Sequence, residues 1–461
     1  MKPSVALIVS CFLFLLIRIF FSCSKNDLLF QHVFPVNAYM TKSDIKIDSA
    51  LFVSQDDINS YAIIQSFKHG KSIVSISPVL SYGILTSYII QYESGWEIVS
   101  SDKRGPIVLA LGEEGSYNEE DMPPAAIEWI ESLNGEIAYR WSLNLPINLN
   151  DDRESESVEF WKNVTFTLGD ESIITKVGDP NAPIGHIELI SVEYTPMVYD
   201  SIPHLTSTLW SQHYPYNYAC PFQRGSTIAR VPAGCGAVAL SQMLYYLHDS
   251  LGVPELAPSY AICTGDIDNY TFDIPEPNSS TIWDSMLPMG GYSDCSYVLV
   301  ADAANRLNTI FTDTTGTTYF SDFPDYFYDY GIGSYYTNHR VSDTLILNLS
   351  NNLPVVMRGA CTDSLGHDHG HFFLVDGFIR YRDEIRSTYR KVWDPPRPIS
   401  LDDDIVLISY STPYIELIKM NWGWGNCLHK DDSYSLTGTW LAAEDCIFDH
   451  GYYMLSGFHV L

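Results

Sequence analysis

Positive charge is scarce in this 461-residue sequence, which has 26 Lys and Arg residues against 56 Asp and Glu and a formal net charge of −30. Such a chain repels a phosphate backbone, so we expect no nucleic-acid binding. The sequence also lacks internal repeats, low-complexity tracts and the P-loop, HExxH and GxSxG motifs, the signatures of nucleotide, zinc-peptidase and serine-hydrolase chemistry. An apolar fraction of 46% with only 18% charged residues indicates a folded chain, and its length predicts two or three domains.

Long apolar runs are confined to the N-terminus. Lys2 precedes an apolar stretch, 5–21, in which Arg18 is the only charge, and Cys23 follows shortly after. This order is typical of a lipoprotein-type signal peptide over residues 1–23, with Cys23 receiving the lipid that anchors the protein to a membrane. The alternatives are an ordinary secretory signal or a single membrane span, and Arg18 disfavours the span. We expect an exported protein, either a cell-envelope lipoprotein or freely secreted.

Cysteine is unevenly distributed. Export permits disulfides, but the cysteines after the signal are odd in number, so at least one thiol stays free if the others pair. The pairing is open at this point. Apart from Cys11 and Cys23, the nine cysteines all lie from residue 220 onward: Cys220, Cys235, Cys263, Cys295, Cys361, Cys427 and Cys446.

The sequence pattern over residues 24–140 predicts a small domain. Alternating segments at 87–101 and 105–113 are typical of strands around a Glu-Ser-Gly turn, and 122–137 predicts a helix opened by two prolines. The next stretch, 141–195, is rich in Asn, Asp, Pro and Ser and lacks clear periodicity. We interpret it as a linker, alone or with small elements, before a second domain.

In that second domain, residues 196–461, Cys235 opens an apolar helix. Backbone N–H groups and the helix dipole at a helix start lower the pKa of a Cys and favour the thiolate, which is the nucleophile in acyl transfer. The alternative is a buried structural Cys or half of a disulfide. The apolar face expected for this helix comprises Ala237, Leu240, Met243, Leu244 and Leu247.

His371 precedes an apolar run, 372–375, that predicts a buried strand closed by Asp376-Gly377, and we expect a Gly-rich loop before the run. His371 lies 136 residues after Cys235 (371 − 235). A Cys followed far downstream by a His is the order expected of a papain-like pair, in which the imidazole takes the thiol proton. A partly buried structural His is the alternative.

Metal binding is a rival interpretation of the same segment. His367, His369 and His371 alternate, so on a strand they would share one face, and zinc favours imidazole ligands. No fourth ligand stands out in the sequence. We therefore expect neither a metal nor another cofactor.

Two further segments can complete a catalytic site. Asn421 follows His371 by 50 residues (421 − 371), and its amide oxygen can orient an imidazole. The indole of Trp422 can cover that contact and exclude water. Gln212 offers an amide donor that can form an oxyanion hole with the backbone N–H of Cys235. A turn with packed aromatic side chains is the alternative for the segment around Asn421.

Together these segments resemble the streptopain-type cysteine peptidase family, which has a papain-like fold. They stand in the family's order, and the segment 87–117 is similar to the family's inhibitory pro-domain. The motifs that carry the resemblance are Trp-x-Gln at 210–212, Gly-Cys at 234–235, Gly-His at 370–371, Asp-Gly at 376–377 and Asn-Trp-Gly-Trp-Gly at 421–425.

The resemblance implies an α+β chain, with a helical subdomain and an antiparallel β subdomain preceded by a small α+β pro-domain at 24–140. It implies a zymogen whose pro-domain blocks the cleft until cleavage in the region 141–195. The mature enzyme would be an endopeptidase acting on protein or peptide substrates and favouring an apolar side chain at P2. The catalytic set implied is Cys235, His371, Asn421, Gln212 and Trp422.

Two departures from the family pattern affect specificity. Gly236 stands where the family has Val, and an insertion of about two dozen residues follows Gly425. The insertion carries Cys427 and Cys446, which can pair and staple it. Two other functions remain open from the sequence: a protease-like binding or inhibitor protein without activity, and a Cys–His enzyme that transfers acyl groups to an acceptor other than water.

Overall fold

The computed structural model describes most of the chain after the predicted signal. The predicted lipid-bearing Cys23 and the proposed Cys427–Cys446 pair lie outside the described residues. Within the described part, no helix is both long enough and apolar enough to span a membrane. The described residues are 50–122, 124–143, 152–169, 184–252, 260–262, 264–265, 271–273, 279–288, 295–337, 342–362, 368–394, 405–423, 439–442 and 450–461.

An N-terminal domain, described over residues 50–169, packs helices against an antiparallel four-stranded meander. The predicted strands and the helix after residue 122 are confirmed. Helix α2 begins at a capping box, in which Ser54 and Asp57 each accept from the other's backbone N–H, and ends at left-handed Gly70. The elements are α2 (Gln55–His69), β1 (Ile73–Ser81), β2 (Ile84–Tyr92), β3 (Trp96–Ser100), β4 (Val108–Gly112), α3 (Pro124–Ser142) and α4 (Asp152–Gly169).

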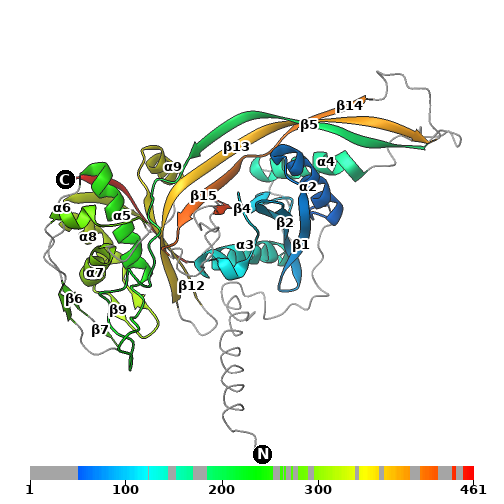
Figure 1. Ribbon diagram of the computed structural model, residues 1–461. Coiled ribbons are helices and arrows are strands. Elements are labelled where there is room, and N and C mark those ends of the chain that lie inside the picture. Colours follow the sequence, from blue (N-terminus) through cyan, green and yellow to red (C-terminus); the bar gives the residue numbers. More distant parts are fainter. Residues whose placement is uncertain are drawn as a thin grey trace, which may run out of the picture.

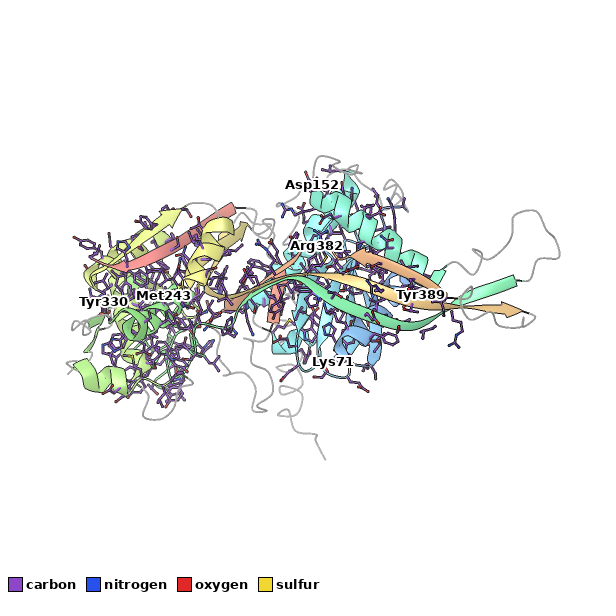
Figure 2. All side chains as sticks on the ribbon, turned by 90° about the horizontal axis from the view of Figure 1, so that it is seen from above. Lys71, Asp152, Met243, Tyr330, Arg382 and Tyr389 are labelled. Carbon is purple, nitrogen blue, oxygen red and sulfur yellow. The ribbon has the colours of Figure 1, made fainter. Side chains whose placement is uncertain are left out.

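The stretch 141–195, interpreted above as a linker, contains helix α4 and much of a long strand, β5 (Ile184–Ile202). β5 pairs along β13 (Asp368–Asp394), which also pairs with β14 (Ile405–Ser411). These strands form a ribbon that extends past α2 and α4, with Arg382 and Tyr389 along it (Figures 1 and 2). Of the described residues in this stretch, α4 buries Phe160, Trp161 and Val164, and β5 is held by its pairing along β13.

A second antiparallel group of strands continues the meander into one sheet. The order is β1-β2-β3-β4-β16-β15-β13-β12-β17-β11, with β5 and β14 beside β13. The short β16 joins the two parts, because it pairs with β4 on one side and β15 on the other. The added strands are β11 (Ile332–Thr337), β12 (Val355–Thr362), β15 (Ile415–Asn421), β16 (Thr439–Ala442) and β17 (His450–Val460).

A layer of helices covers the end of this sheet, around Met243 and Tyr330 in Figure 2. Its central helix is α5 (Cys235–Leu251), the helix predicted from Cys235, and its five expected apolar residues are fully buried. The other elements here are α6 (Ser279–Asp284), α7 (Ser296–Arg306), α8 (Phe323–Asp329), and short strands β6 (Tyr260–Ile262), β7 (Thr264–Gly265), β8 (Thr271–Asp273), β9 (Ile310–Phe311) and β10 (Gly316–Thr317). Helix α9 (Ser342–Ser350) packs on the opposite face of the sheet, where Leu345 and Leu349 join the core shared with the N-terminal domain.

Strand β13 separates two hydrophobic cores. Because side chains alternate along a strand, Phe372 and Leu374 enter the core of the helical layer, whereas Phe373 and Val375 enter a core shared with the N-terminal domain. The predicted α+β class, with a helical subdomain, an antiparallel β subdomain and a small α+β domain before them, is confirmed. The N-terminal domain is thus fused to the sheet that carries His371.

Candidate active site

Cys235 is the first residue of helix α5, and its side chain is half-buried. The preceding Gly234 has φ of +92°, and a Cβ there would lie 2.5 Å from the backbone oxygen of Gly316. Only glycine combines that conformation with so close an approach. The chain therefore enters α5 by a tight turn that leaves the sulfur at the helix start, where backbone N–H groups are unpaired within the helix.

The thiol of Cys235 contacts the imidazole of His371, on β13. Burial raises the pKa of this thiol, but the charge of His371 and its hydrogen bond to the sulfur lower it. The backbone N–H groups of Phe372 and Gly236 lower it further, and the net pKa lies below that of an ordinary cysteine. The sequence-predicted pair is brought together, and its surroundings favour the thiolate.

His371 is held from its other side by a backbone carbonyl. Its Nε2 lies 3.1 Å from the oxygen of Trp422; because a carbonyl can only accept, Nε2 donates and Nδ1 is left for the thiol. The rings of Phe373 and Trp422 lie 6.5 and 6.0 Å from the imidazole between centroids. The prediction of a loop before Phe372 is wrong, because β13 already begins at Asp368 and His371 pairs with Gly359 of β12.

Asn421 lies beside this contact but makes other hydrogen bonds. Its Nδ2 donates to the oxygen of Thr208 at 2.7 Å and to Oγ1 of Thr206 at 3.3 Å. Its Oδ1 accepts from the N–H of Gly423 at 3.2 Å, which closes a tight turn around Trp422. The orienting contact expected of the Asn421 side chain is thus made in this structure by the Trp422 carbonyl, and Asn421 fixes the turn that presents it.

Gln212 lies next to the approach to Cys235. Its backbone oxygen accepts from the N–H of Ala233 at 2.9 Å, two residues before the cysteine. The side chain is largely buried. Trp210 anchors the same segment: its indole donates to the oxygen of Leu287, and its backbone N–H donates to Gln242 of α5. The Trp-x-Gln segment is therefore anchored to α5 by Trp210 and to the turn before Cys235 by the backbone of Gln212.

The glycine after the cysteine has a local explanation. A Cβ at Gly236 would collide with Oγ1 of Thr318 and lie 3.0 Å from Cζ of Phe323. A Val at this position would need that space. The departure from the family pattern is thus compensated by larger neighbours, and helix α5 still starts at Cys235.

Of the three histidines in the metal alternative, His369 and His371 lie on β13. His367 lies outside the described residues, and no cluster of potential metal ligands occurs among the residues that the structure describes. His371 instead makes the contacts with Cys235 and Trp422.

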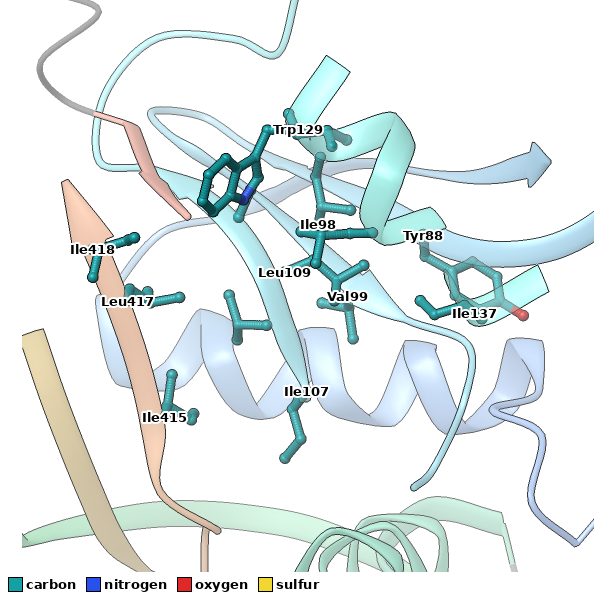
Figure 3. Packing of buried hydrophobic residues seen from close by; sticks show 14 of the residues in the cluster. Tyr88, Ile98, Val99, Ile107, Leu109, Trp129, Ile137, Ile415, Leu417 and Ile418 are labelled. Carbon is teal, nitrogen blue, oxygen red and sulfur yellow. The ribbon is translucent and has the colours of Figure 1, made fainter. Parts of the chain in front are cut away.

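Sequence reasoning missed one side chain from the N-terminal domain. Trp129, on α3, is fully buried, and its ring lies 6.0 Å from those of Phe373 and Trp422 between centroids. Figure 3 shows it near Ile418 of β15. A tryptophan on the predicted helix was visible in the sequence, but its partners are distant in the chain. The N-terminal domain thus packs directly on the residue that accepts from His371.

One family model and two solved structures are similar to this chain. Residues 210–430 match the model of the Peptidase C10 family. A prointerpain A fragment from Prevotella intermedia is similar in structure, with 14% identity and a TM-score of 0.49, over 83% of this chain and 97% of that one. Active interpain A cysteine protease of the same organism has 18% identity and a TM-score of 0.35, over 55% and 94%. Among curated proteins, no match is found.

Proposed function

We propose that this chain is the precursor of an exported cysteine endopeptidase of the streptopain type, with Cys235 as nucleophile and His371 as base. The observation that carries the proposal is the Cys235–His371 contact at the start of α5, which lowers the pKa of the thiol. The match of residues 210–430 to the Peptidase C10 family supports it independently.

In the proposed reaction, His371 takes the thiol proton and the Cys235 sulfur attacks the peptide carbonyl. The tetrahedral intermediate collapses as the imidazolium gives its proton to the leaving amine, and the acyl group stays on sulfur. Water, deprotonated by His371, then attacks the thioester. The carboxylic acid leaves and the thiol is restored.

Three residues assist these steps. The Gln212 amide and the backbone N–H of Cys235 stabilise the oxyanion. The Trp422 carbonyl holds Nε2 of the imidazole and stabilises the imidazolium, and Asn421 holds that carbonyl in place. The single-residue roles rest on the contacts described above and on the order of the motifs.

We also propose that residues 24–140 are an inhibitory pro-domain and that cleavage falls within 141–195. The shared hydrophobic core and the β4–β16 pairing give this domain a large contact with the catalytic part. Protein or peptide substrates would reach Cys235 after its displacement. Export, with a lipid anchor on Cys23, remains a proposal from the first 23 residues.

A cysteine at another helix start offers a matched test. Cys295 is also half-buried and directly precedes a helix, α7. We expect Cys235→Ala to abolish both hydrolysis of an unfolded protein and self-processing while the fold is kept, and Cys295→Ala to retain both. Residual cleavage by the Cys235→Ala variant would show that the nucleophile is misassigned.

A further inference from the structure

A buried carboxylate behind the site leads to an inference that rests on the proposed function and deepens it. Asp376, in β13, is fully buried. Its Oδ2 accepts from both the hydroxyl and the backbone N–H of Thr206, and its Oδ1 accepts from Nδ1 of His204 at 2.8 Å. The N–H of Leu205 donates to the Asp376 backbone oxygen at 3.0 Å. The segment 204–206 is therefore wrapped around one carboxylate.

The hydrogen bonds continue from this carboxylate toward the imidazole. The Thr206 hydroxyl donates its hydrogen bond to Asp376, so its oxygen lone pairs are left to accept from Nδ2 of Asn421 at 3.3 Å. That bond fixes which end of the Asn421 amide faces Thr206, and leaves Oδ1 to hold the N–H of Gly423. The turn so closed aims the Trp422 oxygen at Nε2 of His371.

We propose that Asp376 and Thr206 are positioning residues, which hold the His371 imidazole through Asn421 and the Trp422 carbonyl. Neither touches Cys235. From Asp376 through Thr206 and Asn421 to the turn at Trp422, each hydrogen bond fixes the donor and acceptor of the next. Asn421 and Thr206 are both largely buried. A buried network of this kind fixes a single arrangement, because each unmade bond inside it is costly.

One consequence concerns maturation. The segment 204–208 supplies Thr206 and the Thr208 oxygen that also accepts from Asn421. It follows β5 directly, close to the start of the catalytic domain. The processing cut must therefore lie before Thr206, since a later cut would separate the acceptors that orient Asn421 from the catalytic domain.

The test uses Thr206→Val, which removes the hydroxyl and keeps the shape, in protein that is made as the full chain and assayed after maturation. We expect kcat on an unfolded protein to fall about 10- to 100-fold, since small misplacements of catalytic groups cost up to about 100-fold. KM should change less than about twofold, because no substrate contact is altered. The alkylation profile of Cys235 against pH should move to higher pH, and Thr206→Ser should restore both values.

The matched control is Thr412→Val. Thr412 is equally buried and its hydroxyl accepts from the N–H of Asp383 on the ribbon, so kcat and the alkylation profile should stay unchanged. If Thr206→Val does not fold, Asp376→Asn keeps the shape and should shift both readouts in the same direction. The proposal would be overturned if either variant gives a cooperative thermal unfolding transition, and so is folded, yet keeps kcat and the alkylation profile within about twofold of the parent. Alkylation needs no hydrolysis, so it decides the positioning role even if the peptidase assignment fails.

Discussion

Trp129 gives the sharpest prediction about latency. Trp129→Ala removes a fully buried indole from α3, and such truncations cost about 3–5 kcal/mol. The pairs with Phe373 and Trp422 are each worth about 0.5–1.5 kcal/mol, so about 1–3 kcal/mol of the loss falls on the contact with the catalytic part. Since each 1.4 kcal/mol is tenfold, the open fraction of the precursor should rise about 5- to 150-fold.

The assay measures the rate at which a thiol-directed peptide inhibitor labels the uncleaved precursor. Labelling is monitored by intact-protein mass spectrometry. The control is Trp141→Ala, on the same helix and equally buried, whose ring contacts Phe52 and Arg104 within the N-terminal domain. Labelling should accelerate more in the Trp129 variant than in the control. Equal acceleration would mean that Trp129 acts only through the stability of its own domain, and an unchanged rate would refute the interface argument.

Two further predictions concern stability. Burial raises the pKa of the Glu97 carboxyl to about 7. The protonated carboxyl therefore adds to the free energy of unfolding fully below the unfolded pKa near 4.5, and this stabilisation is lost as pH rises through 7. Glu97→Gln should therefore raise stability by up to roughly 3 kcal/mol at pH 8 and little at pH 4, measured by denaturant unfolding, whereas the exposed Glu93→Gln should change neither. Gly236→Ala should cost about 1–3 kcal/mol through collision with Thr318, and a Thr318→Ala background should recover part of it; full stability of the single variant would contradict the collision.

Local patterns were enough to predict the elements that carry the site. The helix from Cys235 follows from apolar spacing at 3–4 residues, and the strand after His371 from a continuous apolar run. The order of Cys, His and Asn then indicated their pairing. These features are encoded within short windows, where periodicity reports burial directly.

Contacts between distant segments were not predictable in the same way. Whether the Asn421 amide or the Trp422 carbonyl reaches His371 depends on a turn fixed by Thr206, more than 200 residues earlier. Within 141–195, interpreted from the sequence as a linker with or without small elements, α4 and most of β5 form because α4 packs against α2 and β5 pairs along β13, rather than through strong local patterns.

The most direct measurement is labelling with an irreversible thiol-directed peptide inhibitor, followed by peptide mapping. We predict modification at Cys235, with much slower labelling in His371→Ala, because the imidazole is the main group that lowers the pKa of the thiol against the effect of burial. Cys295 provides an internal comparison, since it also lies at a helix start. Labelling of Cys295 at the same rate, or labelling of Cys235 that does not depend on His371, would contradict the account.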